Sequence, residues 1–198
     1  SNPVDIIAHY IYKLSGLPKN QVIGTGTAID SARLQNMIAQ TVNVDPRSVH
    51  AYSMGEHGDS QMVPWSTVTI AGKPFYDVIA DNKELVGDVD LDELVYRTTQ
   101  EGWEIFNRKG TTYYGIATAC VGVIKAILND ENRIIPVSTL LEGEYGERDV
   151  YAGVPTVLNR SGAYDVLEIH MTPGELARFK ESTRVIREYT DRIMKLNL

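Results

Sequence analysis

The sequence predicts an α+β domain in which antiparallel strands pack with long helices. Two stretches of helical periodicity come first, then a group of strands, two further helical stretches, a second group of strands and a final helix. Strands gathered in groups are typical of α+β folds, whereas a parallel sheet requires strands and helices that alternate. The 198 residues show no internal repeat and no linker, so we expect one domain with a substantial core.

Apolar stripes and boundary residues predict the first two helices. Pro3 suits the start of the first helix and Gly16 its end. A second helix should begin near Thr27, because Thr27 and Asp30 have the spacing of a capping box. Its apolar stripe from Leu34 to Val42 offers a face for another subunit.

The rest of the chain divides into short strands, long helices and a strand group. In order, we expect a strand over 49–54, a strand over 65–70, a turn at 72–74, helices over 76–80, 91–107 and 111–128, strands over 134–141, 154–158 and 166–169, and a helix over 172–196. The helix over 111–128 is apolar almost all round, which predicts a central position. Thr172, Pro173 and Glu175 form a helix-start signature before the last helix.

Composition excludes several classes of partner. The net charge of -7, with acids and bases mixed along the chain, disfavours nucleic acid and anionic membranes. No apolar stretch approaches the roughly 20 residues of a membrane span, and no signal peptide is evident. Cys120 is the only cysteine, which suits a reducing cytoplasm and a buried thiol. The four histidines lack metal-ligand spacing, so no metal site is predicted.

One loop places a titratable ring between two glycines. Gly55-Glu56-His57-Gly58-Asp59-Ser60 follows an apolar run, and its glycines permit a tight turn or a close approach to a ligand. Histidine has an unperturbed pKa of about 6.5, which suits proton transfer near neutral pH. The residues alone leave two interpretations open, an exposed histidine in a turn and a proton-transfer site.

Asp30 and Arg33 lie three residues apart and share a helix face. They form either a surface ion pair or a site in which Arg33 binds a carboxylate and Asp30 orients a histidine. A hydrolase triad with Ser60 is disfavoured, because no nucleophile-elbow pattern occurs. Gly24-Thr25-Gly26-Thr27 lacks the third glycine of a dinucleotide fingerprint, so a nucleotide cofactor would be held largely outside this chain.

Several segments together carry a resemblance to a known family. They are Asn2-Pro3-Val4-Asp5, Val22 to Thr27, Asp30-Ser31-Ala32-Arg33, Val49 to Ser60, Lys109 to Gly115, and Gly143-Glu144-Tyr145-Gly146. In order and spacing they resemble the L-lactate dehydrogenases of the lactate/malate dehydrogenase superfamily. The resemblance runs over the whole chain and implies the C-terminal, substrate-binding domain for residues 1–198, with the N-terminal Rossmann domain outside it. That would explain the start at Ser1, for which a tag remnant is the alternative.

The resemblance also implies site residues and a reaction. His57 matches the proton donor and acceptor, Asp30 its carboxylate partner, and Arg33 the clamp on the substrate carboxylate. The remaining matches are Asn2 near the nicotinamide and substrate oxygen, Thr112 in the substrate pocket, and Ile116 beside the nicotinamide. The implied enzyme reduces pyruvate to L-lactate with NADH, and the Rossmann domain holds most of the NAD.

Regulation and assembly are implied less directly. Many bacterial members bind fructose 1,6-bisphosphate between subunits through a histidine, matched by His50, and an arginine, replaced here by Gln35. A neutral amide cannot substitute for a guanidinium on phosphate, so weak or absent activation is predicted. Members of the family usually form dimers or tetramers, so a homo-oligomer is expected.

Three alternatives concern the substrate and the function of the domain. The loop that would distinguish pyruvate from oxaloacetate lies outside the chain, and Gln61 and Met62 depart from the commonest lactate pattern. The alternatives are a hydroxy acid dehydrogenase for branched 2-oxo acids and a malate dehydrogenase. A third, of a different class, is a non-catalytic interaction module that retains the fold.

Overall fold

The computed structural model describes residues 2–195. The helices are α1 Val4–Ser15, α2 Gly26–Val42, α3 Phe75–Asp81, α4 Lys83–Val86, α5 Leu91–Lys109, α6 Tyr113–Leu128 and α7 Pro173–Met194. The strands are β1 Val49–His50, β2 Thr69–Ile70, β3 Lys73–Pro74, β4 Arg133–Glu142, β5 Arg148–Asn159 and β6 Gly162–Val166. The predicted end of the last helix at Leu196 and the first residue, Ser1, lie outside the described residues.

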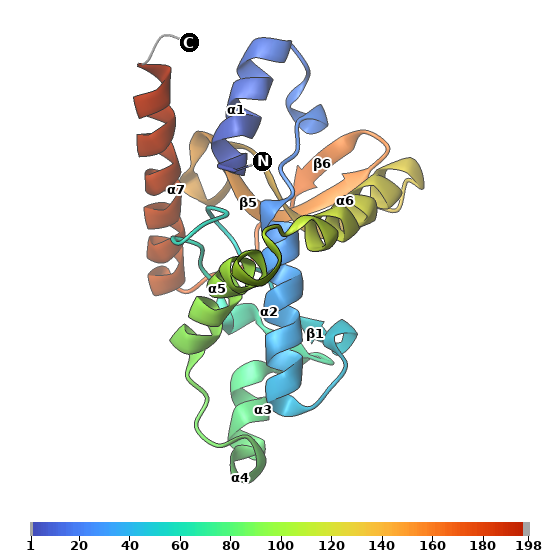
Figure 1. The fold of residues 1–198 in the computed structure, drawn as a ribbon, viewed down its shortest axis with the longest axis vertical. Helices are drawn as coiled ribbons and strands as arrows, with labels where there is room; N and C mark the ends of the chain where they lie inside the picture. The colour runs from blue at the N-terminus through green and yellow to red at the C-terminus, as the bar shows by residue number, and fades with distance from the viewer. Residues whose placement is uncertain (1, 196–198) are drawn as a thin grey trace.

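Two antiparallel sheets build the molecule, as the α+β prediction requires. The larger has the order β4-β5-β6, and the smaller the order β1-β2-β3. The long β4–β5 hairpin pairs Ile134 with Val157 and Leu140 with Tyr151, and most of its inner residues are buried. Figure 1 shows α2 running from this sheet toward the small one, with α7 along one side of the molecule.

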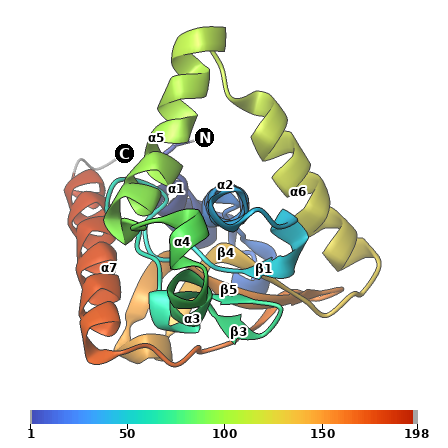
Figure 2. The ribbon, with the colours of Figure 1, turned by 90° about the horizontal axis from the view of Figure 1, so that it is seen from below.

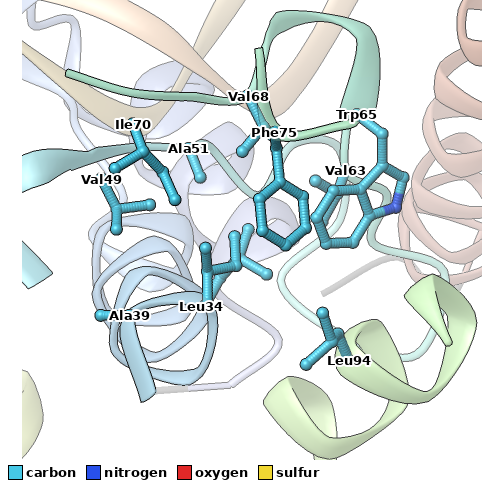
Figure 3. Packing of buried hydrophobic residues seen from close by; sticks show 11 residues of the cluster. Leu34, Ala39, Val49, Ala51, Val63, Trp65, Val68, Ile70, Phe75 and Leu94 are labelled. Carbon is cyan, nitrogen blue, oxygen red and sulfur yellow. The ribbon is translucent and has the colours of Figure 1, made fainter. Parts of the chain in front are cut away.

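The face of α2 predicted as an oligomer interface is instead part of the chain's own core. Leu34 and Ile38 are fully buried against the small sheet, α3 and α5. In Figure 3, Leu34 and Leu94 lie beside the stacked rings of Trp65 and Phe75. The prediction of an interface there was wrong, because an apolar stripe does not reveal whether its cover comes from the same chain.

Helix ends were predicted with mixed success. Gly16 ends α1 in the left-handed conformation, and Thr172 and Glu175 form the predicted capping box of α7. The capping box at Thr27 was wrong: α2 begins at Gly26, and Thr25, its N-cap residue, makes no side-chain cap bond. The carboxylate of Asp30 therefore lies one turn inside the helix, where it is free for another partner.

Strand boundaries also shifted. The expected strand over 65–70 is a 3-10 turn at Trp65–Thr67 followed by the two residues of β2, and the expected turn at 72–74 supplies the edge strand β3. The strand expected over 166–169 ends at Val166, because β6 begins earlier, at Gly162. Short α4 was not predicted.

Helix α6 is not central, contrary to the prediction. Of its residues only Val123 and Ala126 are buried, whereas Tyr114 is 66% exposed and Leu128 72%. Figure 2 shows α5 and α6 meeting at the turn that joins them and spreading apart on either side of α2. An all-round apolar helix indicates that something covers it, but the described residues of this chain do not. Cys120, on this helix, is half-buried rather than fully buried.

Two kinds of feature are absent from the described residues. Within residues 2–195, no helix combines the length and the apolar character that a bilayer crossing demands. In the same part of the chain, no three acidic, histidine or cysteine side chains gather as a metal site would require.

Candidate functional site

The loop that carries His57 is held at both ends by backbone pairing. Before the loop, Gly55 exchanges hydrogen bonds with Gly153 of β5, and Met54 does the same with Met62 on the far side. Gly55 has a φ of 87°, and a Cβ there would lie 2.3 Å from Oγ of Ser182 on α7. Glycine is required at this position for both reasons, since L side chains disfavour that φ and the space is taken.

His57 and Asp30 form a close hydrogen-bonded pair in the site. Nδ1 of His57 lies 2.6 Å from Oδ2 of Asp30, whose residue is only 1% exposed. This hydrogen bond leaves Nε2 as the ring nitrogen free to exchange a proton. A carboxylate at Nδ1 fixes both the orientation and the tautomer of an imidazole.

Arg33 extends the pair to a triad. Its Nη1 lies 3.3 Å from Oδ1 of Asp30, one helical turn away, and its side chain is 11% exposed. Since Asp30 uses one oxygen for His57 and the other for Arg33, the carboxylate joins the two. The remaining guanidinium nitrogens are available for a second carboxylate.

The surroundings favour the protonated form of His57. Burial lowers the pKa of this histidine, but the hydrogen bond to Asp30 and the charges of Asp30 and Asp5 raise it, and Arg33 opposes them. The net effect is a pKa above the ordinary value of 6.5. The imidazolium, the species that a general acid needs, therefore persists to higher pH than in an ordinary histidine.

A pocket of about 710 Å³ joins the predicted site residues, which come from four separate parts of the chain. Those that line it are Asn2, Asp30, Arg33, His57, Thr112 and Ile116. The structure also adds Gly102 of α5, where a Cβ would lie 3.3 Å from the Arg33 guanidinium. Trp103 and Phe106 of α5 complete one wall of the pocket. Amphipathic periodicity placed these residues on a helix but gave no sign that they face His57.

Gln61 lies at the edge of this pocket, and its side chain is held by hydrogen bonds within the protein. It is 7% exposed, and its Nε2 donates to Oγ1 of Thr99 on α5 at 2.9 Å. The amide oxygen accepts from the hydroxyl of Ser53. The residue thereby fastens α5 to the loop segment that follows His57.

A separate pocket contains the two residues considered for effector binding. Gln35 and His50 line a cavity of about 930 Å³ between α2 and α6, together with Arg47 and Arg133. The Gln35 side chain is already engaged, because its Nε2 donates to the carbonyl oxygen of Ala51 at 3.0 Å. Activation by a phosphorylated effector stays an untested prediction.

Gly26, at the start of α2, is a site residue that the sequence did not reveal. A Cβ built there would lie 2.3 Å from Cγ of His57 and 2.7 Å from Cδ2. The side chain of His57 packs against the helix at Gly26 so closely that a residue with a Cβ does not fit there. Gly26 stands out in the sequence only as part of an incomplete nucleotide fingerprint, and its contact with His57 is tertiary.

We therefore expect Gly26→Ala to displace the His57 ring. Overpacking of this kind costs about 1–3 kcal/mol of stability. Denaturant unfolding should show that loss, and the NMR signals of the His57 ring should move. Gly174→Ala is the matched control, because a Cβ there meets nothing within 4 Å. If the two variants behaved alike, the close packing of His57 on Gly26 would be contradicted.

The fold and the triad together define a class of protein, an α+β domain with a carboxylate-paired histidine and an arginine in one pocket. Residues 27–196 match the family described as lactate/malate dehydrogenase, alpha/beta C-terminal domain. The chain belongs to this family.

Relatives and solved structures agree with that assignment. The chain is 52% identical over 189 residues to L-lactate dehydrogenase 3 of Bacillus cereus, covering 96% of the chain and 60% of the relative. It is 47% identical over 194 residues to L-lactate dehydrogenase 1 of Bifidobacterium longum, covering 98% and 61%. The crystal structure of minor L-lactate dehydrogenase from Enterococcus mundtii, in the ligands-bound form, superposes with a TM-score of 0.92 at 41% identity, over 98% of this chain and 61% of that one.

The chain spans about 60% of the length of the curated relatives it matches. The fold expected from the sequence, that of the family's C-terminal domain, is confirmed by the family match and by the superposition.

Proposed function

We propose that this chain is the substrate-binding domain of an NAD-dependent L-lactate dehydrogenase that reduces pyruvate to L-lactate. The observation that carries the proposal is the placement of His57, Asp30 and Arg33 in one pocket, in the contacts that reduction of a 2-oxo acid requires. The similarity to proteins named L-lactate dehydrogenase supports pyruvate over other 2-oxo acids.

Arg33 binds the carboxylate of the substrate in the proposed reaction. A planar guanidinium can hold a carboxylate by two parallel hydrogen bonds, which fixes the rotation of the substrate as well as its position. The ketone oxygen then lies toward Nε2 of His57, the ring nitrogen that Asp30 leaves free. Orientation of this kind lowers the barrier because the reacting groups no longer have to find each other.

His57 supplies the proton. In the direction of reduction, the imidazolium donates it from Nε2 to the ketone oxygen, and the neutral ring is left hydrogen-bonded to Asp30. In the reverse direction, neutral His57 accepts the hydroxyl proton of lactate. Asp30 favours the charged ring and so makes its formation in that direction easier.

NAD fits the residues of this chain only in part. NADH, when bound, supplies the hydride that reaches the ketone carbon. Asn2 offers an amide and Ile116 an apolar surface on the wall of the pocket that His57 shares, which suits one side of a nicotinamide. The sequence has no complete phosphate-binding fingerprint, so the proposal assigns most of the cofactor to a Rossmann domain outside residues 1–198.

The proposal extends to assembly and location. The exposed apolar side chains of α6 support a homo-oligomer, in which such a surface would be covered. The single cysteine supports a cytoplasmic location.

A pyruvate reduction assay tests the proposal. The chain alone and the chain joined to its N-terminal NAD-binding domain would be compared by NADH oxidation, with pyruvate, a branched 2-oxo acid and oxaloacetate as substrates. We expect turnover only with the joined protein, and fastest with pyruvate. Turnover by the chain alone would contradict the assignment of the cofactor. Absence of turnover with every substrate would favour a non-catalytic interaction module.

A further inference from the structure

A second carboxylate, Asp5, contacts His57 from a different direction. Asp5 lies in the first turn of α1 and is 3% exposed. Its Oδ2 accepts a hydrogen bond from the backbone N–H of His57 at 2.9 Å, across 52 residues of sequence. Asp30 therefore holds the ring of the histidine, and Asp5 holds its main chain.

The position of Asp5 is costly for a charged group. Its Oδ1 and the nearby Oγ of Ser138 are both buried and lie outside good hydrogen-bond geometry within residues 2–195, and no lysine or arginine of that range forms an ion pair with Asp5. Burial raises the pKa of Asp5 to about 6, against the opposing effects of the Ser138 hydroxyl, the backbone N–H of His57 and the His57 charge. A neutral side chain would satisfy the same space at lower cost, since an incompletely paired buried charge is unfavourable.

Several charged groups face His57, and they come from two helices. They are Asp5 of α1, and Asp30 and Arg33 of α2, while Glu56 and Asp59 of the loop itself line the same pocket. Asp30 and Asp5 both raise the pKa of His57, and Arg33 lowers it. The buried charge of Asp5 thus acts in the same sense as that of the residue hydrogen-bonded to the ring.

We propose that Asp5 is a positioning residue for His57, which anchors the backbone of the histidine to α1 and presents a second negative charge to its ring. The inference rests on the proposed function only in taking His57 as the proton-transfer group. The alternative is that Asp5 serves α1 alone, as an acid in the first turn of a helix, where the helix dipole favours negative charge.

Two substitutions separate the hydrogen bond from the charge. Asp5→Asn keeps an oxygen that accepts from the His57 N–H but removes the charge, so the ring should titrate at lower pH while the amide stays protected. Asp5→Ala removes both, so the ring should titrate at lower pH and the amide should also exchange at least about tenfold faster, as loss of one hydrogen bond to a charged group implies.

Removal of the Asp5 charge should raise the stability of the folded chain, whereas removal of an acid that only stabilises α1 should lower it. Because the pKa of Asp5 in the folded chain exceeds its ordinary 3.8, this group makes the chain lose stability as pH rises from about 4 to about 6. Asp5→Asn removes that loss, and the variant should unfold at a higher temperature than the wild type at pH 7. If Asp5 only stabilised α1, Asp5→Asn would unfold at a lower temperature than the wild type.

The experiment is an NMR titration of the His57 ring in this chain, with amide exchange of His57 and thermal unfolding measured on the same samples. Asp149→Asn is the matched control, because Asp149 pairs with Lys13 and His9 of α1 at a distance from His57. It should leave the titration and the amide unchanged. An unaltered His57 midpoint in folded Asp5→Asn would overturn the proposal. If Asp5→Ala does not fold, the His57 midpoint of Asp5→Asn alone tests the proposal.

Turnover gives a second measurement, on the complete enzyme. Asp5→Asn should move the high-pH fall of pyruvate reduction to lower pH and leave the half-saturating pyruvate concentration unchanged, since Arg33 is untouched. The NMR result does not depend on turnover. A shifted midpoint without activity would therefore refute the proposed function alone, and activity with an unshifted midpoint would refute the role of Asp5 alone.

Discussion

His57→Gln should abolish turnover in the complete enzyme. Glutamine can still donate a hydrogen bond to a ketone oxygen, but it cannot transfer a proton at neutral pH. Loss of a positioned general acid costs about 10²- to 10⁴-fold in rate, and we expect kcat to fall by at least this range. The half-saturating pyruvate concentration should change little, because Arg33 still binds the carboxylate.

The comparison would be made by steady-state NADH oxidation. His170→Gln is the matched control, because His170 is exposed and lies outside the pocket. Since the pKa of His57 is raised above 6.5, the acid form persists to higher pH, and wild-type pyruvate reduction should decline only above that value. Near-normal kcat in the glutamine variant would refute the assignment of His57 as proton donor.

Arg33→Lys should raise the half-saturating pyruvate concentration steeply. Lysine keeps the charge but loses the planar fork, so one of two parallel hydrogen bonds to the carboxylate is lost. A hydrogen bond to a charged group contributes about 1.5–3 kcal/mol, which corresponds to roughly a 10- to 100-fold increase. The substitution would also alter the contact in which Nη1 of Arg33 lies 3.3 Å from Oδ1 of Asp30.

The effect on kcat distinguishes the two consequences of this substitution. Misplacement of the substrate would lower kcat together with affinity, whereas loss of binding alone would leave kcat near the wild-type value. Arg108→Lys on the exposed face of α5, where the arginine pairs with Glu104, serves as the control and should behave as wild type. Equal affinity for pyruvate in wild type and Arg33→Lys would remove Arg33 from the proposed binding site.

Local patterns in the sequence picked out the residue types of the proposed site, but their roles came from the family resemblance, because the patterns alone left two interpretations open for His57 and for Asp30 with Arg33. Asp30 and Arg33 share a helix face at a spacing of three, and His57 lies between glycines after an apolar run. What could not be predicted depends on contacts between distant segments. Neither the burial of Asp5 beneath the loop nor the close approach of Gly26 to the ring leaves a periodic or local signal.

The fold shows the same division. The number and kind of the long elements followed from periodicity and capping, and α1, α5 and α7 lie where they were expected. The position of α6 was wrong, because apolar composition indicates that a surface is covered without indicating by which chain. The short strands β1 and β3 owe their pairing to tertiary register rather than to intrinsic preference.

The anchoring of the His57 loop has a consequence for the order of folding. The loop is tied to α1 through Asp5, to α2 through Asp30, to β5 through Gly153 and to α7 through Ser182, and its link to Ser182 spans 126 residues. Contacts between such distant residues form late, because closing a long loop costs conformational entropy before the stabilising contacts have formed. A nascent or partly unfolded chain would therefore hold helices and hairpins without the assembled His57 pocket, and the proposed proton-transfer site would form with the last tertiary contacts.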